Sequence, residues 1–277
     1  MLGDARERLR VCDALGVTHE IEAPPRRIVS LVPSITEWLF TIGAGETVVG
    51  VTDYCVHPAL EVNARKRVGG TKNPRLEEIA AIEPDLILAN KEENRKQDVE
   101  RLREMGLRVF VGYPRTVSEA LEELQTLAQI TRREDAAEPL TVAIREVWGR
   151  VRVRRTEVRP KVVALIWKKP YRTVNGDTFA HDMIVQSGGV NPFAASAERY
   201  PRIDETGLVA TGPDVILLPD EPYPFGTTDR DDLLSLDCPA ARQGRIHVVE
   251  GELLTWYGHR MSRGLEVFSG LFGYAAG

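Results

Sequence analysis

The chain is short of the residue types that most often identify a chemistry. Its 277 residues include three cysteines, Cys12, Cys55 and Cys238, with no C-x-x-C spacing, so neither a zinc knuckle nor a disulfide framework is indicated. A formal net charge of −5 argues against a nucleic-acid partner, which would require a basic face. No apolar run approaches the roughly 18 residues of a membrane span. What remains is the composition of an ordinary globular protein with one large domain or two.

The first residues also lack an apolar segment. Gly3–Arg10 reads Gly-Asp-Ala-Arg-Glu-Arg-Leu-Arg and contains no apolar core of about 7 to 15 residues, so it is not typical of a signal peptide. As written, the sequence predicts a cytoplasmic protein, unless a leader has been removed.

Motifs for common catalytic chemistry are absent as well. Gly43-Ala44-Gly45 lacks the third glycine of a dinucleotide fingerprint, and there is neither a P-loop nor a Gly-x-Ser-x-Gly elbow. The five histidines form no H-x-x-x-H pair. We therefore expect no enzyme activity, no catalytic residues, no protein-bound metal and no intrinsic cofactor.

What the sequence does contain is a duplication. Arg27–Val32 is matched by Lys161–Ile166, and Glu83–Leu88 is matched by Gly212–Leu217. In each half a basic residue opens a short apolar run, and a Pro-Asp pair later opens a second one. The first match is offset by 134 positions (27 to 161) and the second by 129 (84 to 213), so the order is kept and only loop lengths differ. This predicts two similar lobes, and a cleft between lobes is a usual place for a small ligand.

Strands alternate with helices in both halves. Continuous apolar runs of this kind are typical of parallel strands that are buried on both faces. After a hairpin at 11–22, the expected strands are 28–32, 48–51, 86–89, 109–111, 161–166, 215–218 and 246–249. The expected helices are one that opens with a capping box at Ser34, then 76–82, 91–105, 180–187 and about 262–272. The pattern predicts an α/β fold with mostly parallel central sheets.

A long helical segment separates the halves. Capping boxes at Thr116–Glu119 and Thr131–Glu134 precede apolar residues at helical spacing. One helix over residues 132–157 would be about 39 Å long at roughly 1.5 Å per residue. We expect the lobes to be joined by this one long helix, with the parts divided into an N-terminal α/β lobe at 1–115, a helical bridge at 116–159 and a C-terminal α/β lobe at 160–277.

The segments that follow the strand ends are rich in aromatic and basic residues, although only 6% of the chain is aromatic. In open α/β sheets, ligands sit beyond the carboxyl ends of the strands. Aromatic faces beside arginine and lysine suit a large, flat or anionic ligand, whereas the alternative is that these rings merely fix loops to the core. The candidate ligand-binding residues are Ser34, Tyr54, Lys91, Tyr113, Arg115, Trp167, Lys168, Tyr223, Phe225, Trp256, Tyr257 and Arg260.

An ordered set of short segments carries a family resemblance. The segments are 27–37, 49–52, 76–79 with 83–87, 188–191 and 213–217. With them, the chain resembles the substrate-binding proteins of ABC importers for cobalamin, haem and ferric siderophores, called helical-backbone metal receptors or class III (cluster A) binding proteins. Tyr54 and Trp167 resemble the corrinoid-facing aromatics of the cobalamin-binding branch. The resemblance implies a monomer that holds cobalamin or a ferric chelate in the interlobe cleft and delivers it to an importer, usually outside the cytoplasm.

The resemblance also implies a docking residue for the permease in each lobe. Glu77, seven residues before Pro84, matches the acidic residue of the first lobe. The same offset from Pro213 falls on Thr206, so Glu205 or Asp204 must substitute, and Glu205 is our candidate. The alternative is that acidic residues in a first helical turn only complement the helix dipole.

Two other functions remain open at this stage. The missing leader favours a cytoplasmic metal-chelate carrier or sensor that has kept the receptor fold. A metal-tetrapyrrole chelatase would require a base and metal ligand facing the pocket, for which His181 and His259 are the candidates.

Overall fold

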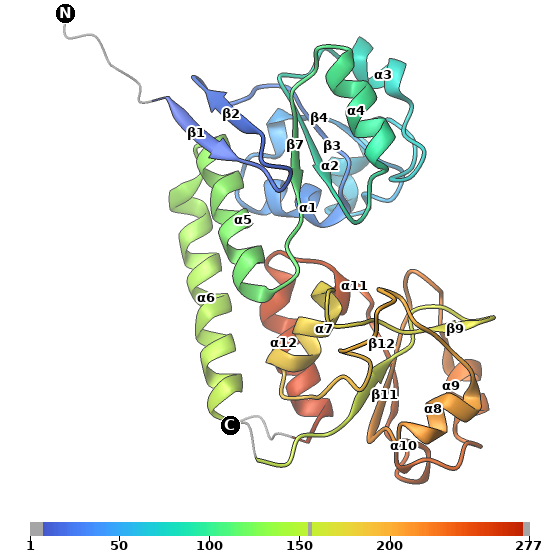
Figure 1. The fold of residues 1–277 in the computed structure, drawn as a ribbon. Helices are drawn as coiled ribbons and strands as arrows, with labels where there is room; N and C mark the ends of the chain where they lie inside the picture. Colours follow the sequence, from blue (N-terminus) through green and yellow to red (C-terminus); the bar gives the residue numbers. More distant parts are fainter. Residues whose placement is uncertain (1–7, 155–156, 274–277) are drawn as a thin grey trace, which may run out of the picture. The chain divides into compact units, whose positions relative to one another are not determined.

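The computed structural model describes residues 8–154 and 157–273, and it has an α/β fold (Figure 1). The chain separates into two compact units. Unit 1 runs to Pro114 and also contains Ala120–Thr141, whereas unit 2 contains Arg115–Glu119 and the chain from Val142 onward. Each unit is built around its own parallel sheet. The three-part division expected from the sequence, with a separate bridge, stays a prediction.

The sheet of unit 1 contains five parallel strands in the order β5-β4-β3-β6-β7. They are β3 (Ile28–Ser30), β4 (Val48–Val51), β5 (Lys66–Arg67), β6 (Leu86–Asn90) and β7 (Val109–Gly112). Every residue of β3, β6 and β7 is buried, as expected for apolar runs covered on both faces. Four of these strands were predicted. Strand β5 was missed because its two basic residues have no apolar pattern.

One face of this sheet packs against two short helices. Val29, Ile87 and Val109 form a core cluster with Ile79 of α3 (Leu76–Ala81) and Leu102 of α4 (Lys96–Glu104). The unit also contains α1 (Pro33–Thr41), the 3₁₀ helix η1 (Gly45–Thr47) and α2 (Ala59–Asn63).

Two helix starts differ from the predicted ones. Helix α1 follows Val32, and no side chain caps it. Pro33 occupies the first turn, where its missing N–H costs nothing, so the predicted capping box from Ser34 lies inside the helix. Helix α4 begins at Lys96 rather than at residue 91. The reason is a turn in which the Asn94 side chain accepts a hydrogen bond from the Asn90 amide at 2.8 Å.

The N-terminal hairpin is held by a buried carboxylate. Strands β1 (Leu9–Cys12) and β2 (Thr18–Ile21) pair antiparallel, as predicted. The fully buried side chain of Asp13 accepts hydrogen bonds from the amides of Leu15 and Val17, both at 2.9 Å, and pairs with Arg103 at 2.7 Å. It also lies 3.3 Å from His19. The turn is therefore tied to α4 through one side chain.

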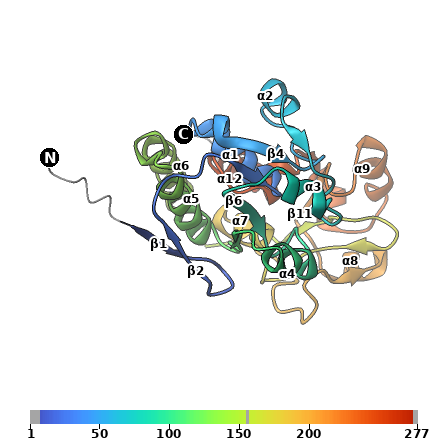
Figure 2. The ribbon, with the colours of Figure 1, turned by 90° about the horizontal axis from the view of Figure 1, so that it is seen from above.

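Two long helices lie side by side in Figures 1 and 2, and each has residues in both units. They are α5 (Val117–Thr131) and α6 (Glu134–Val153). Arg132, with a left-handed φ of 54°, separates them. The Thr131 hydroxyl donates back to the Leu127 carbonyl at 2.8 Å, so the capping box predicted at this point is wrong. The predicted helix ran to residue 157, but α6 ends at Val153, and residues 155–156 lie outside the described part of the chain.

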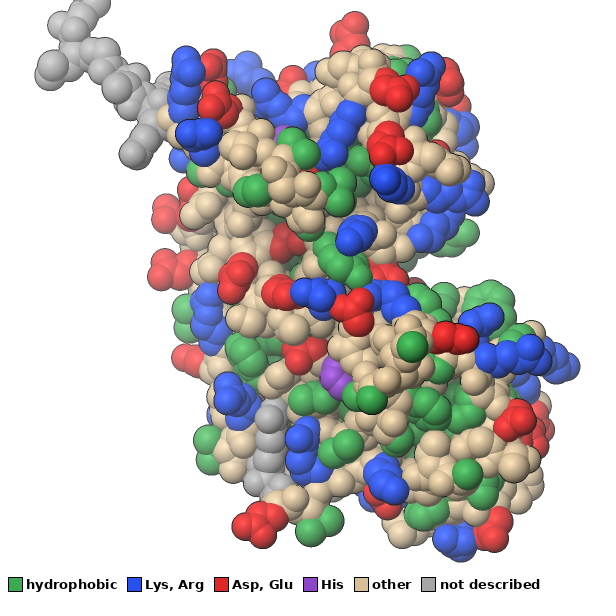
Figure 3. All heavy atoms as spheres, viewed as in Figure 1, with side chains coloured by type: hydrophobic (Ala, Val, Ile, Leu, Met, Phe, Trp, Pro, Cys, Tyr) green, Lys and Arg blue, Asp and Glu red, His purple; other side chains and the backbone are tan. Residues whose placement is uncertain are grey.

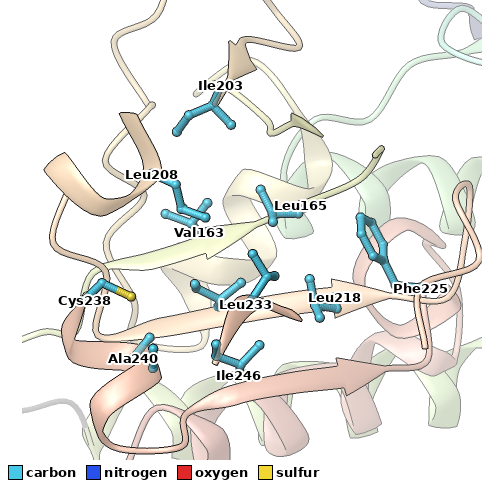
Figure 4. Close-up of a cluster of buried hydrophobic side chains, with 12 residues drawn as sticks. Val163, Leu165, Ile203, Leu208, Leu218, Phe225, Leu233, Cys238, Ala240 and Ile246 are labelled. Carbon is cyan, nitrogen blue, oxygen red and sulfur yellow. The ribbon is translucent and has the colours of Figure 1, made fainter. Parts of the chain in front are cut away.

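Unit 2 has a smaller parallel sheet with strand order β12-β11-β8. Its strands are β8 (Val162–Ala164), β11 (Val215–Pro219) and β12 (Ile246–Val249). Figure 4 shows one face of this sheet packed into a buried cluster that includes Val163, Leu165 and Phe225. Helices α8 (Glu205–Ala210), α9 (Thr227–Leu233) and α10 (Pro239–Arg242) contribute Leu208, Leu233 and Ala240 to the same cluster.

The other elements of unit 2 include one unpredicted ribbon. Its strands β9 (Tyr171–Arg172) and β10 (Arg202–Ile203) pair antiparallel. The remaining helices are α7 (Phe179–Gln186), α11 (Glu252–Thr255) and α12 (Arg260–Leu271). No helix in the described ranges is long and apolar enough to cross a membrane.

The duplication seen in the sequence is repeated in the strand register. Ile28 pairs with Leu86 in unit 1, and Val162 pairs with Val215 in unit 2, which are the same positions after the two offsets. The residues that precede the Pro-Asp pairs, Glu83 and Gly212, share a left-handed φ of 53° and 59°. Glycine takes this conformation without steric cost, whereas glutamate does not. The two halves are therefore copies of one β-strand and helix plan.

Candidate functional site

The parallel sheet of unit 1 gathers the predicted residues of the first half at one edge. Strands β4, β3, β6 and β7 are consecutive neighbours, so their carboxyl ends meet at the same edge. Tyr54 follows β4, Ser34 follows β3, Lys91 follows β6 and Tyr113 follows β7. The topology thus brings together four residues that are spread over 80 positions of sequence (34 to 113).

The loops at this edge are fixed to one another. The Asn94 amide group donates to the Leu31 carbonyl at 3.3 Å and to the Thr71 carbonyl at 3.0 Å. Lys72 donates to the Glu92 carbonyl at 2.6 Å. The segments after β3, β5 and β6 are therefore held to one another by hydrogen bonds.

Tyr54 projects from a loop that is itself well held. Its side chain is 62% exposed. The next residue, Cys55, is buried, and its thiol lies 3.1 Å from the Thr36 hydroxyl and 3.2 Å from the Thr52 hydroxyl. Arg67 donates to the carbonyls of Thr52 and Cys55 at 2.7 and 2.8 Å. An exposed ring on a rigid loop is a suitable platform for a flat ligand.

Lys91 and Tyr113 form a second group at the same edge. The Lys91 ammonium lies 4.6 Å from the centre of the Tyr113 ring, within cation–π range. Glu123 of α5 accepts a hydrogen bond from the Tyr113 amide at 3.1 Å. Its carboxylate also fills the space beside Gly112, where a Cβ would collide with it. Ser34, by contrast, is only 3% exposed, and its hydroxyl has no partner among the described residues.

In unit 2, three aromatic rings follow two neighbouring strands. Trp167, beyond β8, meets Tyr223 edge-on with ring centres 5.7 Å apart. Tyr223, beyond β11, lies 4.6 Å from Phe225. Trp167 is 44% exposed, whereas Phe225 is 3% exposed and points into the core cluster (Figure 4). Phe225 thus packs against Tyr223 from within the core and does not reach the surface.

Lys168 is held by two carboxylates. Its ammonium lies 2.5 Å from Asp229 and 3.1 Å from Asp232, and only 15% of the side chain is exposed. The hydrogen bond to Asp229, together with that to Asp232, raises the pKa of Lys168 well above its ordinary value. The same pairing lowers the pKa of Asp229. Lys168 is thus a charged structural residue whose charge is neutralised within unit 2.

Arg115 and Arg260 are also paired with acidic residues. Arg115 lies 3.3 Å from Glu119 and 2.8 Å from Asp177, and all three belong to unit 2. Arg260 lies 2.9 Å from Glu252. Its guanidinium also lies 5.8 Å from the centre of the Trp256 ring. These arginines hold loops and helices together, and their charge is balanced locally.

The loop after β12 contributes one half-buried and one buried ring. Trp256 is half-buried, and Tyr257 is 4% exposed and packs edge-on against Phe179 of α7 with ring centres 6.0 Å apart. Of the predicted aromatic residues, Tyr54 and Trp167 have the largest exposed fractions.

Sequence reasoning missed Glu221, which follows β11 at the same edge of the unit 2 sheet. Burial, with a contribution from the nearby charge of Glu252, raises the pKa of this carboxyl group. Thr255 donates to it at 3.3 Å. Its position directly after a strand end was visible in the sequence, but its burial depends on α11, which was not predicted.

The two proposed docking residues occupy nearly equivalent helices. Glu77 lies in the first turn of α3, and Glu205 opens α8, the matching helix of the repeat. Both are exposed, and neither has an ion-pair partner among the described residues. Their neighbours are occupied: Glu78 pairs with Lys66 at 3.0 Å, and Asp204 accepts from the Gly207 amide at 2.7 Å as the cap of α8. Of the two acidic residues considered for the second lobe, Asp204 is occupied as a helix cap and Glu205 is not, so Glu205 stays the candidate.

Metal-binding groups are not gathered anywhere in the described ranges. No group of three or more His, Cys, Asp and Glu side chains there could hold a metal ion. His181 of α7 lies 3.2 Å from the Asn191 amide group, and burial lowers its pKa.

With this geometry in view, comparison with known proteins identifies the family. The sequence matches the periplasmic binding protein family over residues 28–249. The chain belongs to this family. Its members are substrate-binding proteins, and the resemblance inferred from the sequence is confirmed.

Three similar proteins illustrate the relationship. The vitamin B12-binding protein of Photorhabdus laumondii subsp. laumondii is 25% identical over 202 residues, which are 73% of each chain. The periplasmic vitamin B12 binding protein BtuF of Vibrio cholerae superposes with a TM-score of 0.78 at 20% identity, over 90% of this chain and 97% of that one. The periplasmic heme-binding protein RhuT of Roseiflexus sp. RS-1 gives a TM-score of 0.77 at 24% identity, over 89% and 97%. At these identities the two structures confirm the predicted α/β fold.

Proposed function

We propose that the protein binds a corrinoid such as cobalamin as cargo, performs no chemistry on it, and delivers it as a monomer to an ABC importer. The observation that carries this proposal is the pair of exposed rings, Tyr54 and Trp167, each at the carboxyl-end edge of a parallel sheet. Family membership and the vitamin B12-binding name of the P. laumondii relative support the same ligand class. A ligand that brings its own metal requires no intrinsic cofactor.

The rings offer enough apolar surface to bind a macrocycle. Trp167 leaves 44% of its surface exposed. For a ring that can bury roughly 200 Å², covering that fraction is worth about 2 kcal/mol at ~25 cal/mol per Å². Tyr54, with 62% exposed, offers a similar gain. Trp167 packs edge-on against Tyr223, and Tyr54 projects from a loop that is held by hydrogen bonds, so little backbone entropy is lost when a ligand covers them.

The charge balance favours a ligand of low net charge. Lys168, Arg115 and Arg260 are each paired with one or two carboxylates of unit 2. On the face drawn in Figure 3, basic and acidic side chains are interspersed rather than separated by sign. A ferric chelate with several negative charges would need many unpaired cations, and these three predicted ligand residues supply none. A corrinoid, whose periphery is mostly amide groups with a single phosphodiester, requires fewer unpaired cations.

We further propose that Glu77 and Glu205 dock the loaded protein on the permease by pairing with arginines. Their exposure and their matched positions in the two repeats support this role. Charge reversal to lysine at either position should reduce uptake in cells without changing the affinity for free ligand.

The direct test is titration of purified protein with cyanocobalamin, followed by its visible spectrum and by calorimetry. We expect micromolar or tighter binding, and we expect Tyr54→Ala and Trp167→Ala each to weaken it about tenfold or more. Leu60→Ala, which alters an 86% exposed side chain of α2, is the matched control and should have no effect. Failure of the wild-type protein to bind any corrinoid would remove the proposal.

One observation favours haem as a second candidate. The exposed phenol of Tyr54 could serve as an axial ligand to ferric iron. Hemin titration of the wild-type protein and of Tyr54→Phe separates the two ligands. Axial ligation would be lost in Tyr54→Phe, with a shift of the visible bands, whereas corrinoid binding, which uses the face of the ring, should be retained.

Cell fractionation tests the delivery step. Protein confined to the cytosol of its native host would contradict delivery to an importer and would support the carrier or sensor function instead.

A further inference from the structure

The β9–β10 ribbon of unit 2 places an exposed ring beside two arginines. Arg172 of β9 is paired directly with Arg202 of β10, and it is paired on its other side with Trp167. Directly opposed residues in antiparallel strands point to the same face, with Cβ atoms about 5 Å apart. Trp167, Arg172 and Arg202 therefore form a row across one face of the ribbon, and all three are exposed.

The pairing of the two arginines is unfavourable by itself, because like charges opposed across strands repel. Arg172 donates to the Tyr200 carbonyl at 3.0 Å. No carboxylate among the described residues pairs with either arginine. This contrasts with Lys168, which lies in the turn before β9 and pairs with two carboxylates of α9, those of Asp229 and Asp232. The positive charge of Arg172 and Arg202 is thus not balanced by a carboxylate, whereas that of Lys168 is.

A hollow beside the ribbon adds a third cation. Its volume is about 440 Å³, and its lining includes Lys169, Tyr171 and Arg202. Lys169 is exposed, and no acidic partner for it lies within the described ranges. The lining also includes Lys168 and two acidic residues, Glu205 and Asp204, which caps α8. The hollow is thus lined by residues of both charges, and two of its cations, Lys169 and Arg202, have no carboxylate partner among the described residues.

We propose that Lys169, Arg172 and Arg202 form a subsite for an anionic oxygen group of the ligand, and that this group is the phosphodiester of a corrinoid's nucleotide loop. The guanidinium fork matches phosphate oxygens in a bidentate manner. With the macrocycle against Trp167, the neighbouring guanidiniums lie at the edge of the ring, where a pendant phosphate would be placed. This inference rests on the proposed function and narrows it to corrinoids that carry the nucleotide loop.

The test compares cobalamin with cobinamide, which has the same corrin ring but lacks the nucleotide loop and its phosphate. Affinities are measured by calorimetry for the wild-type protein, for Arg202→Ala and for Lys169→Ala. We expect each substitution to weaken cobalamin binding about tenfold and to leave cobinamide binding within about twofold of wild type. Arg108→Ala is the matched control, because Arg108 is exposed at the amino end of β7, away from the ligand edge.

Salt provides a second measurement. Raising NaCl from about 50 to 500 mM should weaken cobalamin binding to the wild-type protein and have less effect on the Arg202→Ala variant, because exposed charges are screened. Equal losses of affinity for cobalamin and cobinamide in Arg202→Ala and Lys169→Ala, or no loss of affinity for cobalamin, would overturn the subsite while leaving corrinoid binding intact. Absence of binding to both ligands in the wild-type protein would instead remove the proposed function itself. Unchanged melting temperatures confirm that the variants are folded.

Discussion

Replacing Asp13 by asparagine should destabilise unit 1 by several kcal/mol. The carboxylate is fully buried and accepts from the amides of Leu15, Val17 and Val111 at 2.9, 2.9 and 3.3 Å. It also pairs with Arg103 at 2.7 Å. Amide hydrogen bonds contribute about 1 kcal/mol each and charged ones about 1.5–3. Asparagine retains one acceptor oxygen but places an NH₂ group against these donors, so we expect a loss of about 3–4 kcal/mol.

The effect should depend on pH in a defined direction. Burial alone would raise the pKa of Asp13, but the Val17 amide, His19, the Leu15 amide and the charge of Arg103 together lower it from its ordinary 3.8. A carboxyl group whose pKa is lower in the folded state stabilises the protein above its unfolded pKa. That contribution is lost as the pH falls through the folded pKa. The difference between wild type and Asp13→Asn should therefore be full at pH 6 and shrink below about pH 4.

Urea unfolding followed by circular dichroism and tryptophan fluorescence measures this loss. Two compact units permit two transitions, and only one of them should shift. Trp38, which is fully buried, is the tryptophan that belongs to unit 1. Asp237→Asn is the control, because Asp237 is 88% exposed in an ion pair with Arg242, and such pairs contribute at most about 1 kcal/mol. Similar losses in the two variants would refute the reasoning.

Three further predictions concern stability. Asp85 accepts from two backbone amides, at 2.7 and 2.9 Å, and its repeat partner Asp214 accepts from one at 2.8 Å; alanine should cost about 2 kcal/mol at the first and about 1 at the second, and equal urea midpoints would contradict this. Burial raises the pKa of Glu221. The charged form of this carboxyl group therefore destabilises the folded protein as the pH rises through the folded pKa. Glu221→Gln should melt at a higher temperature than wild type at pH 7, with no difference below about pH 4. Phe225→Ala should cost about 3 kcal/mol or more by calorimetry, and a change near zero would show that its ring is not part of the core.

The sheets could be predicted from the sequence because their strands are apolar throughout. Strands β4 and β12 have the predicted bounds, Val48–Val51 and Ile246–Val249. The β9–β10 ribbon could not be predicted, because two-residue strands with arginine at the paired positions have no apolar alternation. The late start of α4 depends on side-chain bonds of the Asn90–Asn94 turn, which compete with helix formation.

At the candidate site, the residues that follow strand ends could be predicted from the sequence, whereas their burial and their ion pairs could not. The rule that ligands lie beyond strand ends identified the exposed rings of Tyr54 and Trp167 from sequence alone. The same rule selected Phe225, which is buried, because position after a strand does not determine which ring faces the core. The partners of Lys168 lie 61 and 64 residues away in sequence. No local pattern indicates an ion pair across that distance.

Helices α5 and α6 have a consequence for dissecting the molecule. Residues 115–119 group with unit 2, 120–141 with unit 1, and the chain from 142 onward with unit 2 again, so the polypeptide passes between the units three times. No single cut, whether by protease or by gene truncation, therefore leaves all the residues of each unit in one fragment. Independent production of either half will therefore require a redesigned connection rather than a shortened reading frame.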